Sequence, residues 1–280
     1  MSSSTASGGA AGYRPAATLT FASEVRRQAS RRRTHLALGF MVVLPLIILL
    51  AFELGRPGGG GGGSNGQFAS LAQIATWGGL NFALFTLLVS ASFLLVVVVA
   101  LFCGDTVASE ASWGSLRYLL AIPVPRARLL GSKLLVSLLS SLVALLLLTG
   151  VALAVGTLAY GWHPLRTTTG AEITSGEGLL RLAGILCYVA VTLLVVASLA
   201  FLLSVSTDAP LGAVGGAVML QIVSSILDQI TALGSLRVVL PTHYATAWLG
   251  LLSDPIQVDD MVKGTISVIC YAAVFWSLAW

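Results

Sequence analysis

Six long apolar blocks constrain this chain more than any other feature of its sequence. Each approaches the roughly 20 residues that a helix needs to cross about 30 Å of hydrocarbon. Backbone groups in lipid must hydrogen-bond within a helix or a closed barrel, and these continuous Leu/Val/Ala runs lack the alternation of barrel strands. The sequence therefore predicts an all-α integral membrane protein with spans at about 36–52, 76–103, 134–161, 178–205, 211–230 and 265–280.

Composition excludes a soluble protein. Only 9% of the 280 residues are charged and 56% are hydrophobic, whereas a soluble domain carries about 25% charged residues. The first block follows a cluster of arginines, as in a signal peptide, but no small-residue cleavage site follows it. The two lysines stand against thirteen arginines, and this bias, with the many Gly, Ala, Leu and Val residues, indicates a GC-rich bacterial genome such as that of an actinobacterium.

The distribution of positive charge predicts the topology. Ten of the fifteen Lys and Arg residues fall in the N-terminal region and in the loop between the second and third spans. The remaining five are scattered among acidic residues in the loops of the opposite side. The positive-inside rule then places the N-terminus in the cytoplasm. We expect a multi-pass protein of the bacterial cytoplasmic membrane.

The N-terminal region divides into two parts before the first span. Residues 1–17 are mostly Ser, Gly and Ala and are expected to be disordered. Residues 18–35 place Phe21, Val25 and Ala29 at four-residue spacing among arginines, which predicts a basic amphipathic helix lying on the inner leaflet. The alternative is an ordinary positively charged anchor with no further role.

The region 231–263 is the most apolar of the predicted loops. Two apolar stretches flank the sequence Pro241-Thr242-His243-Tyr244. Backbone at membrane depth must be covered by protein, so this composition predicts an external helical hairpin that dips into the outer leaflet.

No motif for chemistry is present in convincing form. Neither lysine belongs to a phosphate-binding loop, and no histidine begins a zinc-protease motif. One Gly-x-Ser-x-Gly match, at 62–66, lies in a glycine run rather than at a strand-to-helix turn. The three cysteines are isolated within predicted spans. We therefore expect no catalytic residue, no metal site and no bound cofactor in this chain, and no nucleic-acid partner.

The loop 104–133 carries the most informative sequence. Asp105 or Thr106 is expected to cap a helix that enters the cytoplasm, and the prolines near its end should stop that helix. Arg126, Arg128 and Lys133 would anchor the next span at the inner headgroups. Such a helix is suited to docking in a groove of a partner, and it would present Glu110, Trp113, Arg117 and Tyr118. The alternative for Glu110 and Arg117 is an exposed pair of little energetic value.

From about Leu19 onwards the chain resembles the type-2 ABC export permeases. The resemblance rests on an ordered set in the loop: Glu110, then Gly114-Ser115-Leu116-Arg117, Leu119-Leu120, Pro123-Val124, Arg126 and Lys133. It implies a six-span permease with an N-terminal amphipathic helix, a cytoplasmic coupling helix and an external helical hairpin before the last span.

The resemblance also implies a function. The loop helix would be the coupling helix that enters the cleft of a separate ATPase subunit, with Gly114 allowing close approach and Pro123 setting the bend toward the third span. The complex would pair this chain with a second copy or a related permease. Two P-loop ATPase subunits, which bind the ATP and Mg²⁺, would drive a drug, peptide, lipid or ion outward.

Two other readings stay open at this point. A stand-alone secondary transporter or channel would need charged or broken helices at mid-membrane, and a non-transporting scaffold would only recruit partners. Members of the family also continue past the sixth span with basic residues, whereas this chain stops at Trp280. The transported substrate does not follow from the sequence.

Polar residues within the spans are candidates for a substrate pathway, because they often face a bundle interior. The alternative role is hydrogen bonding between helices, worth about 0.6 kcal/mol each. The candidates are Asn81, Thr86, Ser90, Gln221 and Asp228.

Overall fold

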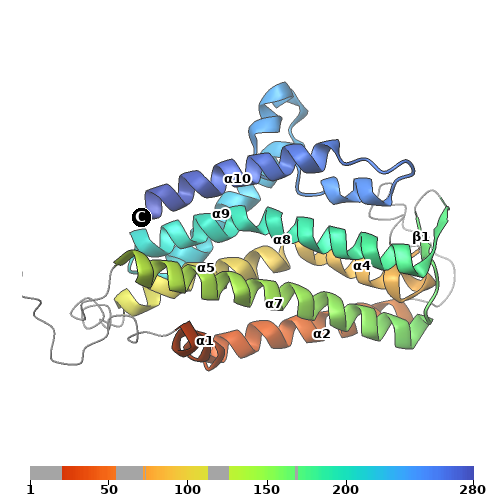
Figure 1. The fold of residues 1–280 in the computed structure, drawn as a ribbon, viewed down its shortest axis with the longest axis horizontal. Coiled ribbons are helices and arrows are strands. Elements are labelled where there is room, and N and C mark those ends of the chain that lie inside the picture. The colour runs from red at the N-terminus through yellow and green to blue at the C-terminus, as the bar shows by residue number, and fades with distance from the viewer. Residues whose placement is uncertain (1–20, 55–71, 73, 113–125, 168–169) are drawn as a thin grey trace, which may run out of the picture.

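The computed structural model describes residues 21–54, 72, 74–112, 126–167 and 170–280 and is almost entirely helical (Figure 1). Its α-helices are α1 (Phe21–Ala29), α2 (Arg32–Leu54), α4 (Gly79–Ala91), α5 (Leu94–Ser112), α7 (Arg126–Tyr160), α8 (Ser175–Ser206), α9 (Pro210–Gln229) and α10 (Asp259–Ala279). The structure also contains the 3-10 helices η1 (Ala75–Trp77), η2 (Thr231–Val239) and η3 (Ala247–Leu252). Its two short strands are β1 (Leu165–Arg166) and β2 (Glu172–Ile173).

Six of these helices are long and apolar enough to cross a membrane, namely α2, α5, α7, α8, α9 and α10. The prediction of an all-α multi-pass membrane protein is confirmed. One end of the bundle holds α1, the starts of α2 and α7 and the end of α5, and we call it the basic end (left in Figure 1). The opposite, distal end holds β1 and β2, which pair antiparallel with Leu165 opposite Ile173.

The predicted second span, 76–103, is interrupted. It consists of η1, α4 and α5, with a turn at Ser92–Phe93 between the two α-helices. Ser90 donates a hydrogen bond to the Thr86 carbonyl over 2.6 Å, and such bonds back to the preceding turn bend helices. The two helices on either side of the interruption pack on different neighbours. Helix α4 packs mainly on α7, and α5 packs mainly on α8 and α9.

The predicted amphipathic helix 18–35 is shorter in the described structure. Helix α1 ends at Ala29, and α2 begins at Arg32. Ser30 follows the last residue of α1, and its hydroxyl donates to the carbonyls of Arg26 at 2.8 Å and Arg27 at 3.1 Å. Arg32 and Arg33 therefore belong to the first turn of the first span.

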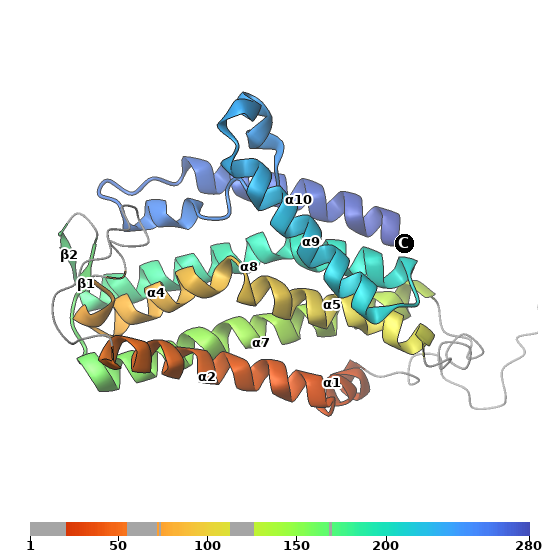
Figure 2. The same cartoon turned by 180° about the vertical axis from the view of Figure 1, so that it is seen from behind.

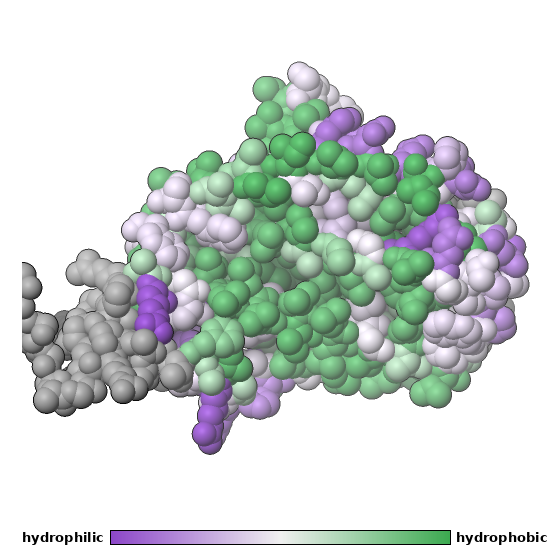
Figure 3. All heavy atoms as spheres, in the orientation of Figure 1, coloured by the Kyte–Doolittle hydropathy of each residue, from purple (hydrophilic) through white to green (hydrophobic). Residues whose placement is uncertain are grey.

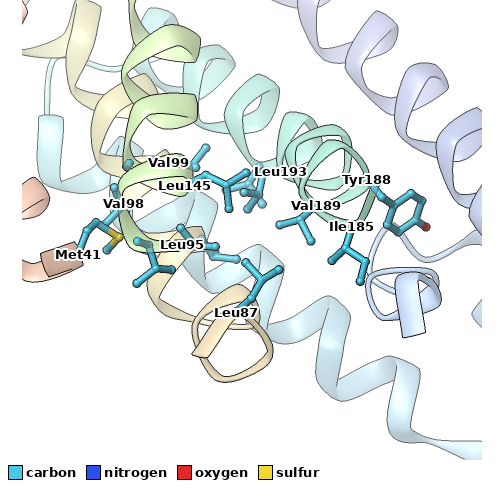
Figure 4. Close-up of a cluster of buried hydrophobic side chains, with 14 of the residues drawn as sticks. Met41, Leu87, Leu95, Val98, Val99, Leu145, Ile185, Tyr188, Val189 and Leu193 are labelled. Atoms are coloured by element: carbon cyan, nitrogen blue, oxygen red, sulfur yellow. The ribbon is translucent and has the colours of Figure 1, made fainter. Parts of the chain in front are cut away.

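The core lies between α2, α4, α5, α7 and α8 (Figure 4). Met41, Leu87, Leu95, Leu145 and Ile185 are each fully buried there. Helices α4 and α7 approach closely at a glycine, because a Cβ at Gly156 would lie 2.8 Å from Cβ of Phe82. Small residues allow such close packing between membrane helices.

The region 231–263 forms two short 3-10 helices, η2 and η3, followed by the start of α10. Figure 2 shows η2 projecting from the bundle where α9 ends. Asp228 holds this region: His243 Nδ1 lies 2.6 Å from its carboxylate and Arg237 Nε lies 3.6 Å away. The last span starts at Asp259, before the predicted residue 265.

The face drawn in Figure 3 is apolar over the middle of the bundle and more polar toward its ends. Many large hydrophobic side chains of α2, α9 and α10 are exposed, including Leu36, Leu211 and Leu278. This pattern is expected of helices that face lipid or another apolar partner.

Candidate functional site

The loop with the coupling-helix motif is described only at its two flanks. Helix α5 ends at Ser112 and α7 begins at Arg126. The candidate residues Trp113, Gly114, Arg117, Tyr118 and Pro123 lie outside the described residues. The flanks, by contrast, contain a dense group of charges at the basic end.

Glu110 is buried, and its predicted place on an exposed docking helix is wrong. It lies in the last turn of α5 with only 2% of its side chain exposed. Its Oε1 atom lies 2.6 Å from Lys133 Nζ and 2.7 Å from Arg27 Nη1. The Glu110 carboxylate is therefore a buried ion-pair partner within the fold. Its burial also contradicts the alternative role, which required Glu110 to be exposed.

Lys133 is buried as well and does not anchor α7 at the headgroups. Its side chain is 1% exposed, and its ammonium donates hydrogen bonds to Glu110 at 2.6 Å and to Glu24 of α1 at 2.9 Å. The single ammonium thus joins α1, α5 and α7.

Asp105 and Thr106 lie inside α5 and do not cap a helix, contrary to the prediction. Asp105 is 3% exposed and accepts hydrogen bonds from Arg31, at 2.8 Å, and from Arg33. Thr106 shares a hydrogen bond of 2.7 Å with Ser137 of α7. The side chains of Asp105 and Thr106 thus have hydrogen-bond partners on neighbouring elements, as buried polar groups usually do.

We call the seven charged residues Glu24, Arg27, Arg31, Arg33, Asp105, Glu110 and Lys133 the ion-pair cluster. Burial lowers the pKa of Arg31, the neighbouring Asp105 acts in the opposite direction, and the nearby arginines lower it further. Removing one partner of a buried pair leaves an uncompensated charge, which costs about 3–5 kcal/mol. The cluster therefore fixes α1 and both flanks of the loop in one arrangement.

A second feature lies beside the interruption between α4 and α5. It is a cavity of about 380 Å³, which we call the break cavity. Mostly apolar side chains of α4, α5, α8 and the 241–249 region line it. Its polar lining residues are Ser92, Thr192, Gln221 and Thr246. Mostly apolar walls with a few polar groups are typical of sites for small molecules.

Only one of the five candidate pathway residues lines the break cavity, and that residue is Gln221. Asn81 lies in the first turn of α4, where its side-chain amide bonds both backbone groups of Arg166, at 2.7 and 3.1 Å. Asn81 thus attaches the β1–β2 hairpin to the bundle.

The other three candidates are also placed by the structure. Thr86 and Ser90 are fully buried on α4. Asp228 lies at the end of α9 and binds the 231–243 region as described above. The polar side chains of Asn81, Ser90 and Asp228 each form hydrogen bonds or ion pairs within the fold. The Thr86 hydroxyl, by contrast, has no hydrogen-bond partner among the described residues.

Sequence reasoning missed the ion-pair cluster, although a signal for it exists. Asp105 and Glu110 follow an uninterrupted apolar run in α5. Carboxylates in such a position require a positive partner nearby, and Lys133 and the arginines preceding the first span were available. What the sequence does not give is the packing that brings α1, α5 and α7 together.

Fold and site together define a multi-pass α-helical membrane protein with a buried ion-pair cluster at one end. The chain belongs to the family described as "Protein of unknown function (DUF2705)", whose model matches residues 65–280. Neither the curated proteins nor the solved structures gave a match. The family match includes the loop, both of its flanks and all of the predicted spans except the first.

Proposed function

We propose that this chain is the transmembrane permease subunit of an ATP-driven ABC exporter. The observation that supports the proposal most is the ion-pair cluster, because it fixes both flanks of the segment 113–125. That segment carries the Gly-Ser-Leu-Arg and Pro-Val sequences of the resemblance. A segment that receives force from a partner needs such rigid attachment to the transmembrane helices.

Helix α5 provides a route from this segment to the break cavity. Its C-terminal turn holds Glu110, and its first turns line the cavity through Val96. In our proposal, closure of the ATPases moves segment 113–125, and α5 transmits this movement as a rigid element. The turn at Ser92–Phe93 absorbs the change, so α5 moves relative to α4 and alters the cavity.

The proposal also sets the orientation and the partners. The basic end faces the cytoplasm, in agreement with the positive-inside rule. Two P-loop ATPase subunits, carrying ATP and Mg²⁺, bind there. A second permease covers part of the exposed apolar surface. The chain itself catalyses no reaction, and its substrate is a drug, peptide, lipid or ion.

Replacement of Arg117 by alanine tests the docking role of segment 113–125. We expect Arg117→Ala to reduce the amount of ATPase that co-purifies with the tagged permease by about tenfold or more, as for a charged hydrogen bond worth about 1.5–3 kcal/mol. Membrane insertion and monodispersity should stay unchanged. Glu110→Ala is unsuitable for this purpose, because Glu110 is a buried partner of Lys133.

Lys263→Ala serves as the matched control, since it removes an exposed positive charge near the start of α10, outside the ion-pair cluster. It should leave ATPase association at the level of the unmodified chain. Equal loss in both variants, or no loss with Arg117→Ala, would count against docking through this segment.

A further inference from the structure

A depression beside the ion-pair cluster is lined mainly by arginine side chains. Its volume is about 520 Å³. It lies where α1 turns into α2, next to the end of α5. Its lining residues are Arg27, Ser30, Arg31, Arg32, Arg33, Ser109 and Glu110.

Positive charge exceeds negative charge around this depression. Five cations (Arg27, Arg31, Arg32, Arg33 and Lys133) face three carboxylates (Glu24, Asp105 and Glu110). Arg32 is exposed and forms no ion pair with any residue that the structure describes. The internal ion pairs therefore leave positive charge at the surface of the depression for an external anion.

An apolar surface of α2 begins directly beside these arginines. Leu36 and Phe40 follow Arg33 at spacings of three and seven residues, so they lie on the same side of the helix. The exposed side chains then continue at alternating spacings of four and three as far as the end of α2. This apolar stripe consists of Leu36, Phe40, Val43, Ile47, Leu50 and Leu54, each between 45% and 75% exposed.

We propose that the depression binds the phosphate group of an anionic phospholipid, whose acyl chains lie along the apolar stripe of α2. The arginines match the charge and geometry of a phosphodiester, and basic pockets at the ends of membrane helices bind anionic headgroups. The stripe distinguishes a lipid from free phosphate, because only a lipid gains from contact with exposed apolar side chains. This proposal needs no ATPase partner and is independent of the proposed function.

The lipid would join α1 and α2 from the membrane side while the ion-pair cluster joins them to α5 and α7. A bound headgroup also neutralises arginines that repel one another across the turn at Ser30–Arg31. We therefore expect the anionic lipid to stabilise this end of the protein.

Titration of the purified full-length chain with short-chain phosphatidylglycerol tests the proposal, with native mass spectrometry to count bound lipid. Phosphatidylcholine with the same acyl chains, glycerol phosphate and inorganic phosphate serve as comparison ligands. Phosphatidylglycerol should bind at least about tenfold more tightly than each of them, since it alone combines a headgroup of net negative charge with acyl chains. Equal binding of phosphatidylcholine, or equal binding of inorganic phosphate or glycerol phosphate, would overturn the lipid assignment.

Arg32→Gln and Arg26→Gln form the matched pair of variants. Both residues are exposed arginines at the basic end, but only Arg32 lines the depression. Arg32→Gln should weaken phosphatidylglycerol binding by about tenfold, as for loss of one charged hydrogen bond, and Arg26→Gln by less than about twofold. Equal effects of the two variants would show general attraction to a basic surface and would contradict a defined site.

Leu36→Gln provides an independent test of the acyl-chain contact. Leu36 is 75% exposed, so the change leaves the fold intact. It should weaken binding of phosphatidylglycerol and leave the response to glycerol phosphate unchanged. Unchanged phosphatidylglycerol binding in this variant would contradict the proposal that acyl chains lie along the apolar stripe. This result would be expected if a second copy of the protein covered the stripe.

Discussion

Replacing Lys133 by methionine should lower the stability of the protein by about 3 kcal/mol, the lower end of the range for breaking a buried ion pair. The substitution keeps most of the length of the side chain but removes the ammonium, while Glu110 stays buried and keeps its ion pair with Arg27. Glu24 of α1 loses the same ammonium. In a thermal-unfolding experiment in detergent, we expect a decrease in Tm of about 6–12 °C, using 2–4 °C per kcal/mol for a chain of this size.

Lys263→Met is the matched control, because Lys263 is the only other lysine of the chain. Its side chain is 61% exposed and its ion pair with Asp260 lies at the surface, so the change should alter Tm by less than about 2 °C. The double variant Glu110→Gln/Lys133→Met should be more stable than Lys133→Met alone, since the buried carboxylate that has lost the Lys133 ammonium is then replaced by a neutral amide. Equal Tm values for the two lysine variants would refute the buried ion-pair cluster.

Replacing Gly156 by leucine should separate α4 from α7 and prevent recovery of well-folded protein. A Cβ at Gly156 would lie 2.8–3.0 Å from Cβ, Cγ and Cδ1 of Phe82. Phe82 is fully buried, with its ring 5.8 Å from the ring of Tyr160, and so cannot move aside without displacing its neighbours. Overpacking of this kind costs about 1–3 kcal/mol or more.

The same substitution at Gly150 is the control. Gly150 is exposed on the same helix, and nothing lies within 4 Å of a Cβ built there. Gly150→Leu should be neutral or stabilising by a few tenths of a kcal/mol, because leucine has a higher helix propensity than glycine. Size-exclusion chromatography with fluorescence detection distinguishes the two variants, and a monodisperse Gly156→Leu peak at wild-type yield would contradict the close α4–α7 contact.

The sequence predicts the spans well because lipid imposes a simple requirement on them. A continuous apolar run long enough to cross hydrocarbon must be a helix. The predicted blocks 134–161, 178–205 and 211–230 correspond closely to α7, α8 and α9. The interruption at Ser92–Phe93 was not predicted, because it depends on the different neighbours of α4 and α5 rather than on local composition.

The candidate site was predicted less well, since it depends on contacts between segments far apart in the chain. Glu110 and Lys133 were placed at a surface because charged residues near a span end are usually solvated. Their burial results from α1 folding back over the ends of α5 and α7, a contact that spans 109 residues in the case of Glu24 and Lys133. Gln221 was identified by its position in a span, and the structure places it at the break cavity.

The proposal that this chain is a permease driven by an ATPase is tested most directly by quantitative co-purification. The tagged full-length chain would be isolated from its native host in mild detergent or lipid nanodiscs, and the bound proteins counted by mass spectrometry. The proposal predicts a P-loop ATPase in a one-to-one ratio with transmembrane chains, in a complex with two of each. Absence of any such ATPase, under conditions that preserve a known ABC complex from the same membranes, would contradict it.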